Sequence, residues 1–527
     1  MPPLRALFYG SAPYHLALWS PPPSAPVLHL RTPWPGSRER GAALLGGVFA
    51  FGGVSAESAM PPWEADRPES WRAALHGFAW LADLAAFDSE AAVKRAREWT
   101  ADWVRRFDVY DSLAWRADVT GNRLFAWIEH YDLLNAGAGS SRDGDALTAS
   151  IARQARHLAH VAGREGAGLR RLAALRGLLA AAAALGRRRA LAQALKRLAR
   201  ALDEQVLGDG GHRGHGPSAQ AEALRYMIDA RTALVAADET VPAFLAAAID
   251  RAGPMLRFFR HGDGRMALFN GAGEGDPAQI DRILAHAGSK GRAPLSAPES
   301  GFERLLAGGT LVVFDCGGPA PPGYDDDAHA GMLAFEMSHA RERIIVNCGD
   351  YRGPSAEWRT AMRATAAHST VVVSDTNAVE IGADGTIGDR PTSVPHQRAE
   401  DGGNLWVAAT HDGYRRFGLT HARRLFLAAD GDDLRGEDSL TGAAGRGFAI
   451  RFHLHPRAMA MFHPEGNAAL IRLAGGSQWR LRAEGAVLSL AESVYMGEGA
   501  PQKTQQIVLD GHVGSGGATV RWAIRRE

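Results

Sequence analysis

Cysteine is nearly absent from this chain, since only Cys316 and Cys348 occur among 527 residues. That scarcity excludes a disulfide framework and any zinc site built from cysteines. An excess of charge is also missing, because 59 lysines and arginines stand against 58 aspartates and glutamates and leave a formal net charge of +1. We therefore expect no nucleic-acid partner, although clustered arginines could still hold a polyanion locally.

Long apolar runs are missing too. No segment reaches about 18 apolar residues without a charge, so we expect no transmembrane segment. The first residues contain no apolar run of signal-peptide length, and the sequence by itself does not reveal a compartment. The Gly-x-Ser-x-Gly, His-Glu-x-x-His and strand-bound Gly-x-Gly-x-x-Gly motifs are absent, which argues against serine hydrolases, zincins and dinucleotide enzymes.

Apolar residues make up 46% of the chain, enough for more than one core. Prolines and glycines crowd residues 20–65, so we expect an irregular lead-in over 1–65. From Ser70, apolar residues such as Trp71, Leu75 and Phe78 recur at spacings of three and four, which predicts an amphipathic helix. Similar patterns predict helices at 90–106, 120–135, 144–162, 169–185, 188–206, 218–237 and 241–260.

After about Ser300 the pattern changes to short β-branched and alternating runs. They predict strands at 310–316, 333–338, 343–347, 370–374, 405–410, 423–427, 448–454, 469–473, 478–482, 505–509 and 519–524. The fold class is therefore α+β and multidomain. Residues 66–300 should form an α/α toroid, an incomplete barrel of helix pairs, and residues 301–527 an antiparallel β-sandwich.

An acidic turn with a tyrosine and a histidine precedes one predicted strand. It contains Tyr324, Asp327 and His329, with Asp325 and Asp326 between them. These groups could bind a metal or transfer protons, or they could form a solvated turn with a capping histidine. His368 starts another strand, so His329 and His368 with an oxygen ligand could hold zinc, or they could be independent.

A glycine-rich loop between two predicted helices carries His212 and His215. It suits contact with a substrate, and the alternative is a tight turn between helices. Arg116, Arg123 and Trp127 offer the charge and stacking that grip acidic sugars, although such residues on a helix also serve as packing and solvated face.

Several of these segments resemble the heparinase II/III-like family of polysaccharide lyases. The clearest are residues 329–336, which read His-Ala-Gly-Met-Leu-Ala-Phe-Glu, and residues 345–349, 358–370 and 451–456. The resemblance implies an α/α toroid followed by a β-sandwich, β-elimination on acidic polysaccharides, a structural zinc held by two histidines and an aspartate, and a place in the cell envelope or periplasm.

Carried over by position, the family's pattern fits this chain in part. His329 and His368 match the metal histidines, whereas the metal aspartate falls on Asn347. The catalytic histidine falls on Asp327, and the catalytic tyrosine falls near Ala219. The toroid's Asn-His pair would fall near residues 170–172, where neither type occurs.

The resemblance therefore leaves three readings open for an acidic, uronate-containing glycan in a cleft between toroid and sandwich. In the first, β-elimination uses Tyr226 or Tyr324 as base and acid and His212 or His215 at the carboxylate, with Arg116, Arg123, Trp127 and Arg359 binding substrate. In the second, the protein binds glycan without turnover or serves as an envelope scaffold. In the third, Asp327 and a neighbouring aspartate act as paired carboxylates.

Overall fold

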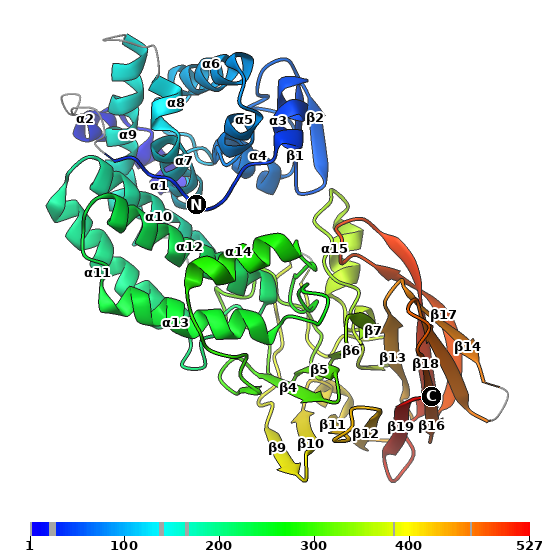
Figure 1. Ribbon diagram of the computed structural model, residues 1–527. Helices are drawn as coiled ribbons and strands as arrows, with labels where there is room; N and C mark the ends of the chain where they lie inside the picture. Colours follow the sequence, from blue (N-terminus) through cyan, green and yellow to red (C-terminus); the bar gives the residue numbers. More distant parts are fainter. Residues whose placement is uncertain (1–2, 20–27, 136–141, 164–167, 383–384, 464–465) are drawn as a thin grey trace. The chain divides into compact units, whose positions relative to one another are not determined.

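The structure is a computed structural model that describes residues 3–19, 28–135, 142–163, 168–382, 385–463 and 466–527. The first part is helical and the last is built of strands (Figure 1). The main helices are α4 (Glu69–His76), α5 (Leu81–Phe87), α6 (Glu90–Arg106), α7 (Ala117–Glu129), α8 (Tyr131–Asn135), α9 (Arg142–Val161), α10 (Leu169–Ala184), α11 (Arg188–Gln205), α12 (Pro217–Ala236) and α13 (Ala243–Phe258). These helices match the predicted ones closely.

The helices pack through aromatic and glycine contacts that the sequence pattern supplies. The Ser89 hydroxyl accepts a hydrogen bond from the Ala92 amide at the start of α6, whose Trp99 and Trp103 are buried. Helices α7 and α10 cross at glycines, because a Cβ atom on Gly177 would lie 2.1 Å from the Gly121 carbonyl oxygen. The two helix backbones therefore touch directly at this crossing.

The lead-in is more regular than we predicted. It contains α1 (Pro3–Tyr9), α2 (Ala12–Leu18), α3 (Arg38–Leu45) and a hairpin of β1 (Val48–Phe51) and β2 (Val54–Glu57). Tertiary contacts hold these short elements despite the prolines and glycines. The Tyr14 hydroxyl donates to His157 Nδ1 at 2.8 Å, and the fully buried Phe49 ring lies 5.4 Å from Trp99.

The strands form two antiparallel sheets. One has the order β14 (Ala458–Phe462), β15 (Ala468–Leu473), β16 (Gln478–Glu484), β19 (Ala518–Arg526), β12 (Asp433–Gly442), β11 (Leu419–Leu427), β10 (Asn404–His411) and β9 (His396–Asp401). The other has the order β17 (Val487–Tyr495), β18 (Gln502–His512), β13 (Gly447–Leu454), β7 (Glu342–Val346), β6 (Phe335–His339), β5 (Thr310–Asp315), β4 (Phe302–Ala307) and β3 (Ser296–Ala297), with β8 (Val371–Val373) also paired to β13. A continuous apolar core lies between them.

The sequence pattern missed α14 (Pro277–Ala287), α15 (Ala356–Arg363) and strands β3, β4, β9, β12, β14 and β17. Strand β12 shows why, because its buried face includes a carboxylate, Asp438. Arg423 on β11 donates to both oxygens of Asp438 at 2.7 and 3.1 Å, and Trp522 Nε1 donates to it at 2.9 Å. His421 Nε2 donates as well, at 2.8 Å. Donors from neighbouring strands thus satisfy the buried charge of Asp438, whereas a sequence pattern predicts that an aspartate lies on the surface.

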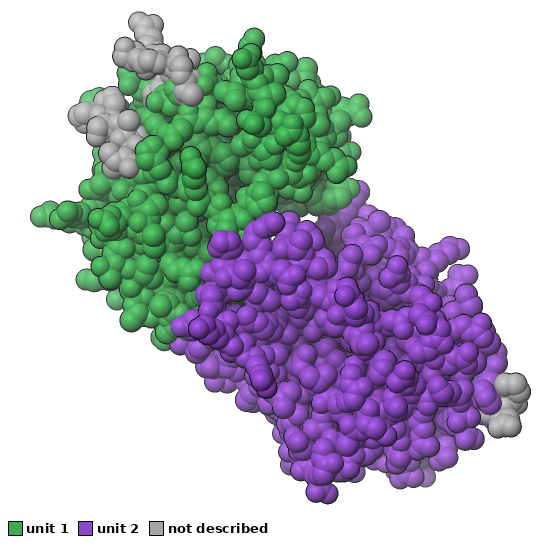
Figure 2. Space-filling model, viewed as in Figure 1, with its two compact units in different colours: residues 1–205, 223–249 green, residues 206–222, 250–527 purple. Residues whose placement is uncertain are grey.

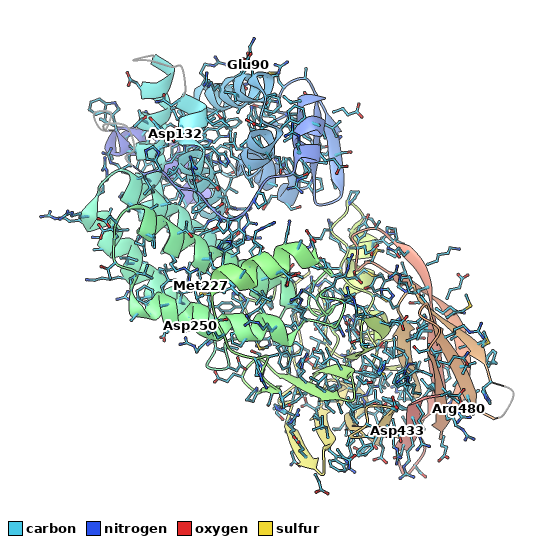
Figure 3. The ribbon with its side chains drawn as sticks, viewed as in Figure 1. Glu90, Asp132, Met227, Asp250, Asp433 and Arg480 are labelled. Carbon is cyan, nitrogen blue, oxygen red and sulfur yellow. The ribbon has the colours of Figure 1, made fainter. Side chains whose placement is uncertain are left out.

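The chain divides into two compact units, coloured in Figure 2. Unit 1 comprises residues 1–205 and 223–249, and unit 2 comprises residues 206–222 and 250–527. The change from helix to strand near residue 300 therefore lies inside unit 2, which also takes in the glycine-rich loop. Figure 3 shows side chains of both units, among them Asp433 and Arg480 on the eight-stranded sheet of unit 2. In the part of the chain that is described, no helix is both long and apolar enough to cross a membrane.

Candidate functional site

The glycine-rich loop of unit 2 holds its two histidines in different states. Gly210 has φ of +87° and its Cβ would lie 2.1 Å from the Arg251 carbonyl oxygen, so only glycine fits there. His212 is buried, and its Nδ1 accepts the Gly214 amide at 3.0 Å. Burial, followed by the charges of His215 and Arg213, lowers the pKa of His212 to about 4. His212 is therefore neutral.

His215 is half-buried and keeps one ring nitrogen open. Its Nδ1 donates to the Gly318 carbonyl oxygen at 3.3 Å, and its Nε2 has no partner among the described residues. Burial lowers the pKa of His215, so the open Nε2 is a hydrogen-bond acceptor near neutral pH. The His215 backbone has φ of +49°, and the side-chain Nδ2 of Asn270 donates to the His215 carbonyl oxygen at 2.7 Å.

The Asn270-Gly271 turn joins the glycine-rich loop to the acidic turn. The Asn270 side-chain oxygen accepts the His329 amide at 3.1 Å, so this one side chain bonds to both segments. A Cβ atom on Gly271 would lie 2.7 Å from the Asp327 Cβ. The motif-based prediction missed Asn270, although the Asn-Gly dipeptide is itself a turn signal that could have revealed the bend.

The acidic turn presents Asp327 to solvent beside other negative charges. Desolvation by the surrounding protein raises the pKa of Asp327, and the charges of Asp350, Asp326 and Glu222 add to this effect while Arg352 opposes it. Arg352 donates to Asp350 at 2.8 Å and to the Gly271 carbonyl oxygen at 2.9 Å. The mouth of the turn is therefore rich in carboxylates.

Tyr324 lies on the same turn and contacts the glycine-rich loop. It is half-buried, its ring centroid lies 6.4 Å from that of His212, and the Arg213 guanidinium lies 5.8 Å from its centre. Tyr324, His212 and His215 are thus neighbours in unit 2, as a shared site requires.

His329 and His368, which are distant in sequence, lie side by side, as the shared-site alternative requires. Their nearest nitrogens lie 3.1 Å apart, and both rings are buried. His329 Nε2 accepts the Gly271 amide at 3.1 Å, which places the ring proton on Nδ1, from where it is donated to His368 Nε2. His368 Nδ1 donates to the Ala364 carbonyl oxygen at 2.8 Å. All four ring nitrogens are therefore satisfied within the protein.

The resemblance implied that zinc binds here, and the donor set does not fit that ion. The Asn347 side-chain oxygen already accepts the Ser369 amide at 2.9 Å, and its Nδ2 is buried without a partner. His329 could offer Nδ1 to a metal only by placing a proton on Nε2, opposite the Gly271 N–H. Among the described residues no group of three or more histidine, cysteine, aspartate or glutamate side chains could hold a metal ion. Four tetrahedral ligands are not assembled.

Two of the residues predicted to bind substrate from the toroid are core residues. Arg123 and Trp127 are fully buried. The Arg123 guanidinium stacks 3.9 Å from the Trp103 ring and donates to Gln154 and to the His76 carbonyl oxygen. These contacts correct the prediction, because an arginine that is satisfied inside the helical core cannot reach a ligand.

The other predicted residues have protein partners as well. Arg116 donates to Asp118 at 2.6 Å and pairs with Glu69. Tyr226, in unit 1, is buried with the Arg176 guanidinium 4.4 Å from its ring centre. Arg359 is exposed on α15 and donates to the Gly353 carbonyl oxygen at 3.2 Å, so its contact with substrate stays a prediction.

Comparisons with known proteins bear on the whole chain. A family model described as Heparinase II/III-like, C-terminal, matches residues 289–523. A protein of Caulobacter vibrioides named FtsZ-localized protein C is 34% identical over 543 residues, which cover 98% of this chain and 93% of that protein. This chain belongs to the heparinase II/III-like family.

Solved structures place this heparinase II/III-like chain in the lyase fold. Heparinase III matches with a TM-score of 0.76 and 14% identity over 100% of this chain and 92% of that one. A heparan sulfate lyase of Pedobacter heparinus matches with a TM-score of 0.62 and 18% identity, over 93% of this chain and 82% of that one. A chondroitin AC lyase of Streptomyces coelicolor A3 matches with a TM-score of 0.57 and 12% identity, over 98% of this chain and 80% of that one. The predicted toroid and sandwich are confirmed. Because the sequence identities are low, these matches show the fold alone, and any activity must be argued from this chain's own residues.

Proposed function

We propose that this heparinase II/III-like protein binds an acidic polysaccharide without cleaving it by β-elimination. Two of the structural neighbours named above are lyases of heparan sulfate and of chondroitin, and the chondroitin lyase was solved in complex with chondroitin sulfate. In this chain the half-buried Tyr324 ring and the open Nε2 of His215 offer an aromatic surface and a hydrogen-bond acceptor to a sugar.

One observation argues against turnover: the buried histidines have no ring nitrogen available to a substrate. His329 and His368 use every ring nitrogen on each other and on the backbone, and His212 is buried. β-Elimination needs a base, an acid and a group that neutralises the substrate carboxylate. At the position of the family's catalytic histidine this chain has Asp327, and the negative charges of Asp350, Asp326 and Glu222 near it disfavour a uronate, while Arg352 offsets part of their effect.

Binding and cleavage separate in one experiment. The protein is incubated with heparan sulfate and chondroitin sulfate while binding is measured by calorimetry and the unsaturated uronate product is followed by absorbance. We expect binding that is weakened by Tyr324→Ala and unchanged by His512→Ala, an exposed control on β18, with no product. A product that His215→Ala abolishes would show a lyase and refute the proposal.

The named relative supports a second candidate function. Because FtsZ-localized protein C is 34% identical over nearly the full length, we propose that this protein too is positioned by FtsZ. A fluorescent fusion imaged together with FtsZ tests this, and we expect its localised signal to disperse when FtsZ is depleted. A distribution that does not change on depletion would reject this candidate and leave glycan binding to its own test.

A further inference from the structure

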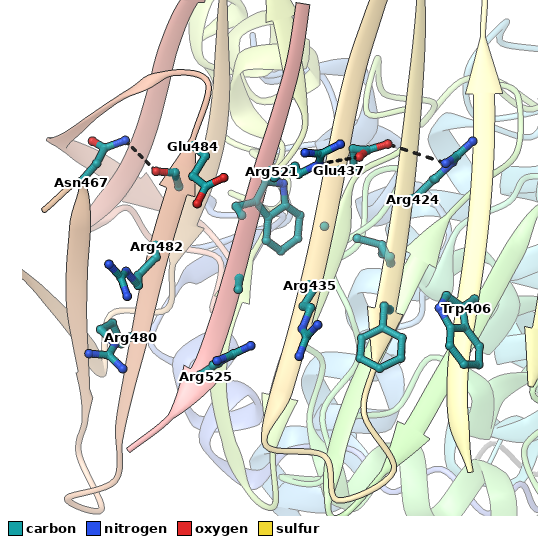
Figure 4. Close-up of a pocket in the computed structure, with 16 residues that line it drawn as sticks. Trp406, Arg424, Arg435, Glu437, Asn467, Arg480, Arg482, Glu484, Arg521 and Arg525 are labelled. Carbon is teal, nitrogen blue, oxygen red and sulfur yellow. Dashed lines mark hydrogen bonds and ion pairs between the residues drawn. The ribbon is translucent and has the colours of Figure 1, made fainter. Parts of the chain in front are cut away.

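The outward face of the eight-stranded sheet carries an arginine-rich groove, which Figure 4 shows in close-up. Its volume is about 540 Å³, and strands β10, β11, β12, β19 and β16 form most of it. Two glutamates, Glu437 and Glu484, line it together with six arginines: Arg424, Arg435, Arg480, Arg482, Arg521 and Arg525. A chain with a net charge of +1 thus concentrates positive charge on one face of unit 2.

The alternation of side chains along each strand brings these residues to one face. Residues two apart point the same way, so Arg480 and Arg482 on β16 lie side by side along the strand. Register then aligns neighbouring strands, which are about 4.8 Å apart. Arg480 is opposite Arg525, and Trp406, Phe426 and Arg435 follow one another across β10, β11 and β12.

The groove's own acidic residues leave part of this charge uncompensated. Glu437 pairs with Arg521 at 3.0 Å and with Arg424 at 3.7 Å. Outside the groove, Asp433 pairs with Arg435 and Arg525, and Glu527 pairs with Arg480. The Arg482 side chain has no ion pair or hydrogen bond with any described residue.

The facing pair of arginines is a second sign of an anionic ligand. Like charges directly opposite on neighbouring strands destabilise a sheet. Arg480 and Arg525 occupy such positions, and Arg482 adds a third guanidinium beside them. Glu527, on Arg480, and Asp433, shared by Arg525 and Arg435, offset only part of this repulsion. A sulfate or carboxylate group bound among the three arginines would relieve the rest, because guanidinium groups bind oxyanions through paired hydrogen bonds.

Aromatic rings extend the groove on its other side. Trp406 is 37% exposed, and its ring centroid lies 5.0 Å from that of Phe426. The Arg435 guanidinium lies 5.3 Å from the Phe426 ring centre. This arrangement offers a stacking surface next to a row of cations (Figure 4).

We infer that this groove binds a linear acidic polysaccharide, with its anionic groups on Arg480, Arg482 and Arg525 and a sugar ring on Trp406. The site is separate from His215 and Tyr324, so the inference holds whether or not those residues bind glycan. An acidic peptide fits less well. The strands that form the groove are paired on both sides, so they offer no free backbone groups to a peptide strand.

Charge removal tests the arginine cluster. The full-length variant Arg480→Gln/Arg482→Gln/Arg525→Gln is compared with Arg341→Gln/Arg446→Gln/Arg457→Gln, which removes three exposed arginines elsewhere in unit 2. On immobilised heparin we expect the first variant to elute at lower salt than wild type and to bind about tenfold more weakly, which corresponds to about 1.4 kcal/mol for three exposed ionic contacts. The control should elute like wild type. Equal elution of both variants overturns the inference, with melting curves showing that each is folded.

The aromatic surface tests the class of polymer. We expect Trp406→Ala to weaken a sulfated oligosaccharide several-fold and to leave the weaker binding of polyglutamate unchanged. Polyglutamate that binds as tightly as the oligosaccharide, with both insensitive to Trp406→Ala, would assign the groove to an acidic polypeptide and overturn the inference. Failure of Tyr324→Ala to affect binding, by contrast, would refute only the site proposed above.

Discussion

Mild acid should unfold this protein, because many of its buried histidines resist protonation in the folded state. Burial is the main cause that lowers the pKa of His76, His157, His212 and His368 to about 4. The pKa of His453 falls to about 3 for the same reason. In the unfolded chain each titrates near 6.5. As the pH falls below about 6.5, the unfolded chain therefore gains protons that the folded protein refuses, and stability is lost.

The magnitude follows from the number of protons. Five histidines take up about five protons on unfolding between about pH 6 and 5. Burial raises the pKa of Asp315 to about 8, so this carboxyl is protonated when folded and releases a proton on unfolding, which cancels one histidine. The raised pKa of Asp327 opposes in part, while the lowered pKa values of His329 and His411 add protons. The five histidines less Asp315 alone give a net uptake of about four protons, which corresponds to about 5 kcal/mol per pH unit and rivals the whole stability of a domain.

Urea unfolding followed by circular dichroism at half-unit steps from pH 7.5 to 5 measures this slope. The variant His157→Gln removes one buried imidazole, so its slope should fall by about 1.4 kcal/mol per pH unit, and His512→Gln, which is exposed, should leave the slope unchanged. Lowered carboxylate pKa values act at lower pH and do not interfere in this window. A free energy of unfolding that stays flat from pH 7 to 5 would refute the reasoning.

Three further predictions concern a buried ion pair, a helix crossing and the zinc content of the protein. Asp438→Asn should destabilise unit 2 by about 3–5 kcal/mol in urea unfolding because Arg423 loses its buried counter-charge, whereas the exposed Asp510→Asn should change stability little; equal effects would contradict this. Gly177→Ala should destabilise unit 1 by about 3 kcal/mol or more, since α7 and α10 must separate, while Gly163→Ala, whose Cβ meets nothing closer than 3.8 Å, should be tolerated. Metal analysis of the purified protein should find far less than one zinc per chain, and a chelator should leave its melting temperature unchanged; stoichiometric zinc would restore the metal site implied by the resemblance.

Periodicity predicted most of the fold because most of its elements bury one apolar face. It failed where packing partners decide the outcome. Helices α1 and α2 are too short to be read from pattern and are held by contacts such as Tyr14 with His157. Strand β12 carries Asp438 on its buried face, where the charge is tolerated because Arg423, His421 and Trp522 from neighbouring strands donate to it.

The site was predicted in part for similar reasons. The family's pattern brought His329 and His368 together correctly, since strand ends far apart in sequence meet at one edge of a sheet. It could not reveal which way their protons lie, because that depends on the Gly271 amide. Arg123 was mistaken for a ligand contact, since amphipathic spacing does not distinguish a solvated arginine from one stacked on Trp103.

The Asn270-Gly271 turn also means that Asn270 should deamidate only while the protein is unfolded. Asparagine is thermally labile, most of all before glycine, where the next amide nitrogen can attack the side-chain carbonyl. Here that nitrogen donates its proton to His329, and both ends of the Asn270 side chain are engaged. Deamidation at residue 270 should therefore accumulate with time spent unfolded. Once formed, an aspartate there would lack the donor that holds the His215 carbonyl, so an aged chain would refold with its glycine-rich loop released.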